Sequence, residues 1–351
     1  MSLYDEVEKD SAYAEVANVA ASLESERKKH QATRRELAKA QERTTELEGL
    51  LERYATVKPD DQKVPKWLGR KLPRKEHHAT PVLMFSDLHL DEVVDRYEMD
   101  GLNEYDRDIA RARIERVTEG AIDLAANYVS GVELDGIMVP FLGDIVTGDI
   151  HDELARTNES PVPATIAHWV PFLASMLRHL ADHFGTVHVP CVDGNHDRTY
   201  KRVPAKKRAE SSNAWIIYNW MADMCRDDER ITFGISTSPE QVVSVYDTRF
   251  LLSHGDGFRS SGGIGGIYPS MNKWLLRKHD MYGSAGKQWD YALIGHWHQL
   301  IWGRDVVVNG STKGLDEYAK SMGFGFERPS QAMFIVTPEN GIVQRMPVFA
   351  D

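Results

Sequence analysis

Five apolar runs in this chain stop abruptly at short clusters of Asp, His, Asn and Gly, and this pattern constrains the fold most. The clusters are Ser86-Asp87-Leu88-His89, Gly143-Asp144, Gly194-Asn195-His196-Asp197, Ser253-His254-Gly255-Asp256 and Gly295-His296-Trp297-His298. Short apolar runs of this kind are typical of buried strands. Because ligands of α/β proteins bind beyond the carboxyl ends of the strands, we expect the five clusters to converge there.

The chain after residue 78 predicts an α/β domain with helices packed on sheet faces. Its apolar runs lie at 82–85, 136–142, 187–192, 249–253, 291–294, 305–308, 332–336 and 342–349. Helical spacing of Ala, Leu and charged residues occurs near 105–128, 163–184 and 205–226. With 351 residues, 42% of them hydrophobic, the chain can form a sizeable core.

The residue types in the clusters predict a metal site. Asp87 with His89, and His296 with His298, are pairs two residues apart, which leave a strand on the same side and can bind one ion together. A single pair of this kind usually consists of solvent-exposed polar residues or includes a buried structural histidine, and binds no metal. Five such clusters, each at a strand end, are hard to explain in that way. Carboxylate, imidazole and amide ligands suit Mn, Fe, Zn or Co better than Ca, and the supply exceeds the needs of one ion. We therefore expect two metals.

The ordered set DxH, GD, GNHD, HG and GHxH resembles the calcineurin-like metallophosphoesterase superfamily over roughly residues 80–350. That resemblance implies a four-layer α/β/β/α sandwich with a dinuclear site. It assigns one metal to Asp87, His89, Asp144 and His298, and the other to Asp144, Asn195, His254 and His296. It further implies two divalent ions, with Mn preferred over Fe, Zn, Co, Ni or Mg, and it gives catalytic roles to His196, Asp144 and Asn195.

Departures from the family patterns favour a phosphodiesterase or a nuclease of the DNA-repair type. Protein phosphatases of this superfamily typically carry GDxVDRG and GNHE, whereas this chain has GDIVTGD from Gly143 and GNHD from Gly194. Thr147 and Gly148 replace an Asp and a phosphate-binding Arg. A small-molecule phosphodiesterase, a phosphomonoesterase and a non-catalytic scaffold of the same fold remain as alternatives.

A basic run follows the Asn-His loop in a chain whose formal net charge is −11. We predict that Arg198, Tyr200, Lys201 and Arg202 contact a nucleic acid or other phosphodiester, and that the following cations, Lys206, Lys207 and Arg208, extend the groove. A solvated loop is the equally weighted alternative. Lys313, in the long polar segment 310–330, is a further candidate substrate contact.

The N-terminal part of the chain predicts a separate helical segment. Residues 1–57 contain no Pro and one Gly, and an imperfect heptad pattern of apolar residues indicates a coiled coil that joins copies of the chain or binds a partner protein. A helix packed on its own domain is the alternative. Residues 58–78 form a basic linker with three prolines, and 79–351 form the catalytic domain. The two cysteines, the absence of a signal sequence and the absence of a membrane span predict a reduced, cytoplasmic protein.

Overall fold

The computed structural model describes residues 77–202, 204–260 and 266–351, with scattered positions between 23 and 45. Those scattered residues are helical and exposed, and the rest of the expected coiled coil and most of the linker lie outside the described residues. The chain separates into two units, Met1–Pro59 with Ser284–Gly286, and Asp60–Gly283 with Lys287–Asp351. The fold below is that of the second unit.

The larger of two sheets has the strand order β12-β11-β1-β3-β4-β5, with β2 beside β1. Its strands are β1 (His78–Leu83), β2 (Glu133–Leu134), β3 (Ile137–Met138), β4 (Val187–Cys191), β5 (Ile231–Ile235), β11 (Ser330–Thr337) and β12 (Gly341–Phe349). The central strands β1, β3, β4 and β5 are parallel, whereas β11 and β12 are antiparallel additions at one edge. The carboxyl ends of the central strands therefore lie at one end of the sheet.

The smaller sheet has the order β6-β7-β8-β10-β9. Its strands are β6 (Glu240–Val245), β7 (Thr248–Ser253), β8 (Tyr291–Ile294), β9 (Ile301–Trp302) and β10 (Val306–Val308). Strands β7, β8 and β10 are parallel, and β6 and β9 pair antiparallel at the two edges. This sheet, too, presents the carboxyl ends of its central strands at one end.

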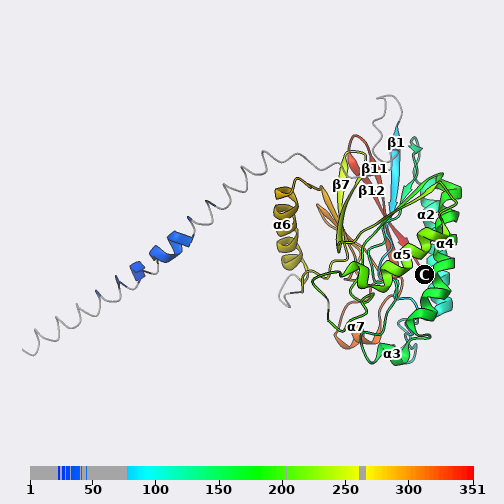
Figure 1. Ribbon diagram of the computed structural model, residues 1–351, viewed down its shortest axis with the longest axis horizontal. Coiled ribbons are helices and arrows are strands. Elements are labelled where there is room, and N and C mark those ends of the chain that lie inside the picture. Colours follow the sequence, from blue (N-terminus) through cyan, green and yellow to red (C-terminus); the bar gives the residue numbers. More distant parts are fainter. Residues whose placement is uncertain are drawn as a thin grey trace, which may run out of the picture. The chain divides into compact units, whose positions relative to one another are not determined.

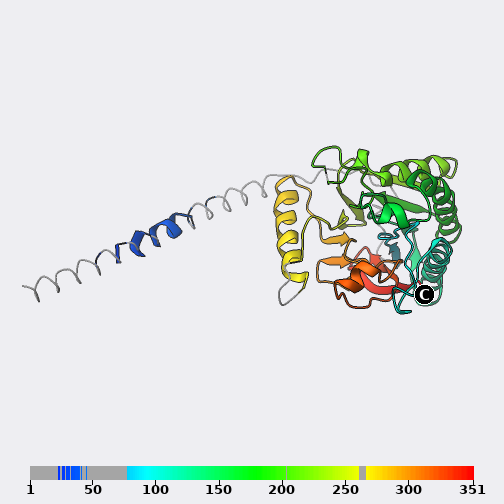
Figure 2. The same ribbon diagram turned by 90° about the horizontal axis from the view of Figure 1, so that it is seen from below.

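Side chains of β1 show how the layers pack. Leu83 belongs to the core between the larger sheet and the helices α2 (Arg107–Asn127), α4 (Val162–Phe184) and α5 (Asn213–Met224). Val82, on the opposite face, packs with Phe250 and Leu293 of the smaller sheet. The far face of the smaller sheet is covered by α6 (Tyr268–Ser284) through Met271 and Trp274. The layers are thus helix, sheet, sheet and helix, with α6 on the opposite side from α2, α4 and α5 (Figures 1 and 2).

Local sequence explains where the main helices begin. The Asp106 carboxylate accepts a hydrogen bond from the N–H of Ile109 at the start of α2, and the Ser212 hydroxyl does the same for Trp215 in α5. Pro161 and Gly185 flank α4. The remaining helices are short: α3 (Leu154–Thr157), α7 (Glu317–Ser321) and a 3-10 turn, Ala209–Ser211.

Every apolar run from the sequence overlaps a strand, but four strands and the helices α3, α6 and α7 were not foreseen. β5 and β6 are edge strands with partly exposed, mixed sequences, so neither shows a continuous apolar run. Conversely, the run 136–142 forms only the two-residue β3, since Pro140 lacks the N–H that a continuing ladder needs. In the part of the chain that is described, no helix has the length and apolar character needed to cross a membrane.

Candidate metal centre

The five polar clusters leave strands of both sheets. Three follow β1, β3 and β4 of the larger sheet, and two follow β7 and β8 of the smaller sheet. Backbone hydrogen bonds tie neighbouring loops together: Asp87 donates to Gly143 (3.1 Å), His89 donates to Asp144 (3.1 Å), and Gly295 donates to His254 (2.9 Å). The His296 N–H donates to the Asp87 carboxylate (3.0 Å), which links the loops of the two sheets, and the Asp144 N–H donates to Asp197 (2.6 Å), which links the loops after β3 and β4.

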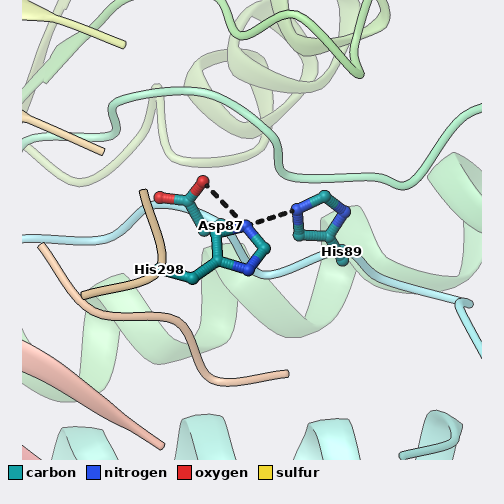
Figure 3. Close-up of side chains that lie close together, drawn as sticks. All are labelled: Asp87, His89 and His298. Atoms are coloured by element: carbon teal, nitrogen blue, oxygen red, sulfur yellow. Dashed lines mark hydrogen bonds and ion pairs between the residues drawn. The ribbon is translucent and has the colours of Figure 1, made fainter. Parts of the chain in front are cut away.

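Cluster 1 comprises Asp87, His89 and His298, whose ligand atoms all lie within 4.8 Å of one another. The Nε2 atoms of His89 and His298 are 3.1 Å apart, and His298 Nε2 lies 3.4 Å from Asp87 Oδ1 (Figure 3). Asp87 and His89 are buried, whereas the side chain of His298 is 28% exposed. Two loops from different sheets thus bring three donor atoms together.

Cluster 2 comprises Asp144, His254 and His296, again with ligand atoms within 4.8 Å of one another. His254 Nε2 lies 3.0 Å from Asp144 Oδ2 and 3.0 Å from Asn195 Oδ1, so Asn195 adjoins this cluster. The same Asp144 Oδ2 lies 3.9 Å from His89 Nε2 of cluster 1. Asp144 is therefore placed to serve both clusters.

Backbone conformation at the clusters is unusual. Positive φ angles are rare for residues other than glycine. Five cluster residues nevertheless have them: Asp87 (55°), His89 (47°), Asp144 (53°), His296 (71°) and His298 (51°). Such strain persists only where surrounding contacts enforce it, and it concentrates at functional sites. The fold therefore holds these side chains in place at a cost in backbone energy.

Two glycines permit the close approach of the loops. A Cβ on Gly194 would lie 2.2 Å from both the backbone N and Oδ1 of Asp144. A Cβ on Gly295 would lie 2.5 Å from Oδ2 of Asp87. Any side chain at either position would displace a carboxylate of the site, which explains why the clusters contain glycine there.

Hydrogen bonds at Nδ1 orient two of the histidines. His254 Nδ1 donates to the carbonyl oxygen of Leu142 (2.7 Å), which leaves Nε2 as the atom that can bind a metal. His89 Nδ1 faces the Glu92 carboxylate at 3.4 Å. Glu92 is itself held by Lys313 (2.9 Å) and by the hydroxyl of Thr147 (2.8 Å). Such outer partners are typical of metal-binding histidines, and the donor set fits divalent metal ions.

Asp197 connects the loops that carry Asp144 and Asn195. Its fully buried carboxylate accepts hydrogen bonds from the backbone N–H groups of Asp144 (2.6 Å), Ile145 (3.1 Å), Val146 (3.3 Å) and Gly194 (3.0 Å). Burial and the Asp144 charge raise the pKa of Asp197 to about 7, against the effect of these donors. The sequence placed Asp197 in a polar cluster but gave it no role.

Charges inside the clusters shift the pKa values of their members. Burial alone would raise the pKa of Asp144, but His254 and His196 hold it well below the ordinary value. Burial lowers the pKa of His254, and Asp144 outweighs this and raises it to about 10. Burial and Lys313 lower the pKa of His89. The metal-free His254 therefore carries a proton that a bound metal ion has to displace.

His196 lies beside the clusters but belongs to neither. Its ring centroid is 4.8 Å from that of His89, in an edge-on arrangement, and 5.9 Å from that of His151. Nδ1 donates to the carbonyl oxygen of Thr147 (3.1 Å), so Nε2 is the nitrogen left to exchange a proton. Burial lowers the pKa of His196 to about 4. The metal-free side chain is thus a neutral imidazole near neutral pH.

The residues predicted to contact substrate lie in the loop after His196. The Arg198 guanidinium donates to the carbonyl oxygens of Asn195, Tyr200 (2.9 Å) and Lys201 (3.3 Å), which stabilises the loop itself. Lys201 pairs with Asp152 at 2.9 Å, and both side chains are exposed. Tyr200 is 57% exposed, and Arg202 is exposed as well.

Two further cations differ from the sequence-based expectation. Lys313 is 3% exposed and pairs with Glu92 and Asp316, so it contacts carboxylates of the protein and lies away from solvent. Arg208, whose side chain is 13% exposed, lies between Asp193 and Asp256, whereas Lys206 and Lys207 are exposed. Sequence patterns show charge but not burial, which explains both differences.

Comparisons with known proteins give little beyond this geometry. No family model and no curated protein matches the chain. Among solved structures, a dimetal phosphatase from Danio rerio is similar, with 10% identity and a TM-score of 0.32 over 78% of this chain and 99% of that chain. A TM-score of this size does not establish a shared fold, so the site is interpreted from its own residues.

Proposed function

We propose that this chain is a metal-dependent phosphoesterase that hydrolyses phosphodiester bonds. The observation that carries the proposal is the pair of three-residue clusters at one end of both sheets, with Asp144 within 3.9 Å of a histidine of each. Two adjacent divalent ions are suited to phosphoryl transfer, because they activate a water molecule and neutralise the phosphoryl oxygens. Of the ions that suit carboxylate, imidazole and amide ligands, we propose manganese as the one that this protein uses.

The protein residues divide the work around the phosphate. Asp87, His89 and His298 would hold one ion, and Asn195, His254 and His296 the other, with Asp144 between them. Nε2 of the neutral His196 ring carries no proton, because Nδ1–H donates to Thr147, so it would accept a proton from the attacking water and then give that proton to the leaving oxygen. The buried carboxylates and fixed histidine tautomers keep the site organised before substrate arrives.

A phosphodiester of nucleic acid is the substrate that the surroundings favour. The Thr147 hydroxyl donates to Glu92, and neither Thr147 nor Gly148 supplies the cation that would bind a doubly charged phosphomonoester. Exposed cations follow the Asn195 loop at Lys201, Arg202, Lys206 and Lys207. Positive side chains at that position suit an extended anionic chain, whose binding releases counterions.

The first test compares bis-p-nitrophenyl phosphate with p-nitrophenyl phosphate on manganese-reconstituted protein. The proposal predicts the higher kcat/KM for the diester, and no hydrolysis of either ester with any divalent ion tested would contradict it.

A second test addresses nucleic acid. Lys206→Glu with Lys207→Glu should weaken single-stranded oligonucleotide binding and reduce its log–log salt slope by about 1.4, with small diesters unaffected. Lys273→Glu with Arg277→Glu on α6, also exposed, is the control. An unchanged salt slope in the 206/207 variant would remove the nucleic-acid assignment and leave the phosphodiesterase.

A further inference from the structure

Arg208 joins two of the loops that form the metal centre. Its Nε lies 2.6 Å from Oδ2 of Asp193, and its Nη1 and Nη2 lie 2.9 Å and 3.2 Å from the two oxygens of Asp256. The side chain of Arg208 is 13% exposed, and those of Asp193 and Asp256 are 2% and 13% exposed. The contact with Asp256 is a two-bond fork, the geometry that distinguishes arginine from lysine.

The two aspartates are close in sequence to ligands of cluster 2. Asp193 lies two residues before Asn195, in the loop after β4 of the larger sheet, and Asp256 lies two residues after His254, in the loop after β7 of the smaller sheet. One guanidinium therefore joins a loop of each sheet, and the nearby ligand atoms on these loops, Asn195 Oδ1 and His254 Nε2, lie 3.0 Å apart.

Asp193 depends on this contact for its charge balance. Asp193 Oδ1 is buried and has no hydrogen-bond partner among the described residues. The carboxylate is therefore held through Oδ2, which accepts a hydrogen bond from Arg208. Without the guanidinium, the buried Asp193 carboxylate would have no opposite charge beside it, and the loop would lose the ion pair that holds it in place.

We propose that Arg208 is a positioning residue for cluster 2, holding the loops of Asn195 and His254 at the separation at which both can bind one metal ion. The inference rests on the proposed metal centre and adds a residue outside its ligand set. It also reassigns part of the basic run, from contact with substrate to support of the site.

Arg230 offers a matched control elsewhere in the fold. It too binds two aspartates, Asp228 through Nε (2.9 Å) and Nη2 (2.7 Å), and Asp182 through Nη1 (2.8 Å). Arg230 directly precedes β5, at the end of the larger sheet opposite to the metal centre. Its removal tests what losing an arginine with two ion pairs does to the protein in general.

The experiment measures Mn²⁺ binding to metal-free full-length protein by calorimetry. The wild type should bind two ions. Arg208→Ala should retain one site and weaken the other by about 10- to 100-fold, Arg208→Lys should fall between, and Arg230→Ala should match the wild type. Should Arg208→Ala fail to fold, Asp256→Asn removes the two-bond fork and should weaken the same site.

A second background assigns the loss to a cluster. In His89→Ala protein, in which cluster 1 is disabled, Arg208→Ala should weaken the remaining site by the same factor. In His254→Ala protein it should change nothing further. Two unchanged sites in Arg208→Ala, or an equal loss in Arg230→Ala, would overturn the inference. A wild type that binds no Mn²⁺ would instead overturn the proposed function.

Discussion

Cluster 1 and cluster 2 contain the same kinds of ligand but are supported in different ways. In cluster 1, a charged side chain orients the histidine: Glu92 lies 3.4 Å from His89 Nδ1 and is held by Lys313. In cluster 2, a backbone carbonyl orients His254, and the ion pairs of Arg208 lie one step further out, on the loops. The arrangement in cluster 1 sets the orientation and charge environment of one ligand, His89. The arrangement in cluster 2 sets the distance between two ligands on different loops.

This difference teaches where each cluster is vulnerable. A carboxylate at Nδ1 makes an imidazole a stronger ligand, so changing Glu92 should act on the affinity of one site directly. A backbone carbonyl cannot be changed by substitution, so cluster 2 can be weakened from outside only through its loops. Asp144 belongs to cluster 2 and its Oδ2 lies 3.9 Å from His89 Nε2 of cluster 1, so replacing Asp144 should affect both clusters.

The largest effect is expected for Asp144→Asn. Loss of the shared carboxylate should weaken both sites and lower the kcat for bis-p-nitrophenyl phosphate by at least about a thousandfold, since charge stabilisation by both ions is lost together. Elemental analysis after gel filtration checks the metal content. Asp149→Asn, the same change at an exposed residue nearby, is the control. Two ions retained in Asp144→Asn would show that the clusters do not share this ligand.

The next effect concerns His196, which follows Asn195 in sequence but contacts His89 of cluster 1. If Nε2 exchanges a proton with the leaving oxygen, His196→Gln should lower the rate on alkoxide leaving groups by about 10²–10⁴-fold. The rate on a nitrophenolate ester should fall far less, because that leaving group needs no proton. Both ions should remain bound. Equal losses on both esters would assign His196 to phosphate binding.

A smaller effect, confined to cluster 1, is expected for Glu92→Gln. The amide keeps the size of the side chain but removes the charge near His89 Nδ1 and leaves buried Lys313 with Asp316 as its carboxylate partner among the described residues. One Mn²⁺ site should weaken by about 10- to 100-fold in calorimetry, with the other unchanged.

Glu98→Gln, at an exposed position, serves as its control. In combination with Arg208→Ala, the two losses should add and fall on different sites, because the substitutions act on separate clusters. A loss on a single shared site would mean that the two support networks are one.

The sequence pointed to the side chains that the structure brings together in the two clusters more completely than to the residues around them, for a physical reason. Asp87, His89 and the other cluster residues stand directly after apolar runs, so their place at a strand end can be read locally. Glu92 and Lys313 are 221 residues apart, and Arg208 and Asp256 are 48 apart, so only the folded chain brings them together. Strands β5 and β6 were missed for the same reason: each forms by pairing with a neighbouring strand, β4 and β7 respectively, and no local sequence pattern identifies that pairing.

The smallest effect concerns His188 and the decrease in the stability of the metal-free fold at acidic pH, as distinct from the loss of metal ions at that pH. His188 lies on β4, near the start of a strand whose far end leads to Asn195; its ring is buried, and Nδ1 lies 3.0 Å from the Thr232 hydroxyl. Burial lowers the pKa of His188 from 6.5 to about 4. The unfolded chain therefore binds the proton more readily. The contribution of His188 to the free energy of unfolding is complete above pH 6.5 and decreases as the pH drops toward 4.

His188→Gln should remove about 1 kcal/mol of the destabilisation that metal-free protein suffers between pH 7.5 and pH 5.5 in urea unfolding. The exposed His183→Gln is the control. An acid loss of stability identical in His188→Gln and wild type would contradict this prediction and assign the acid sensitivity to other groups.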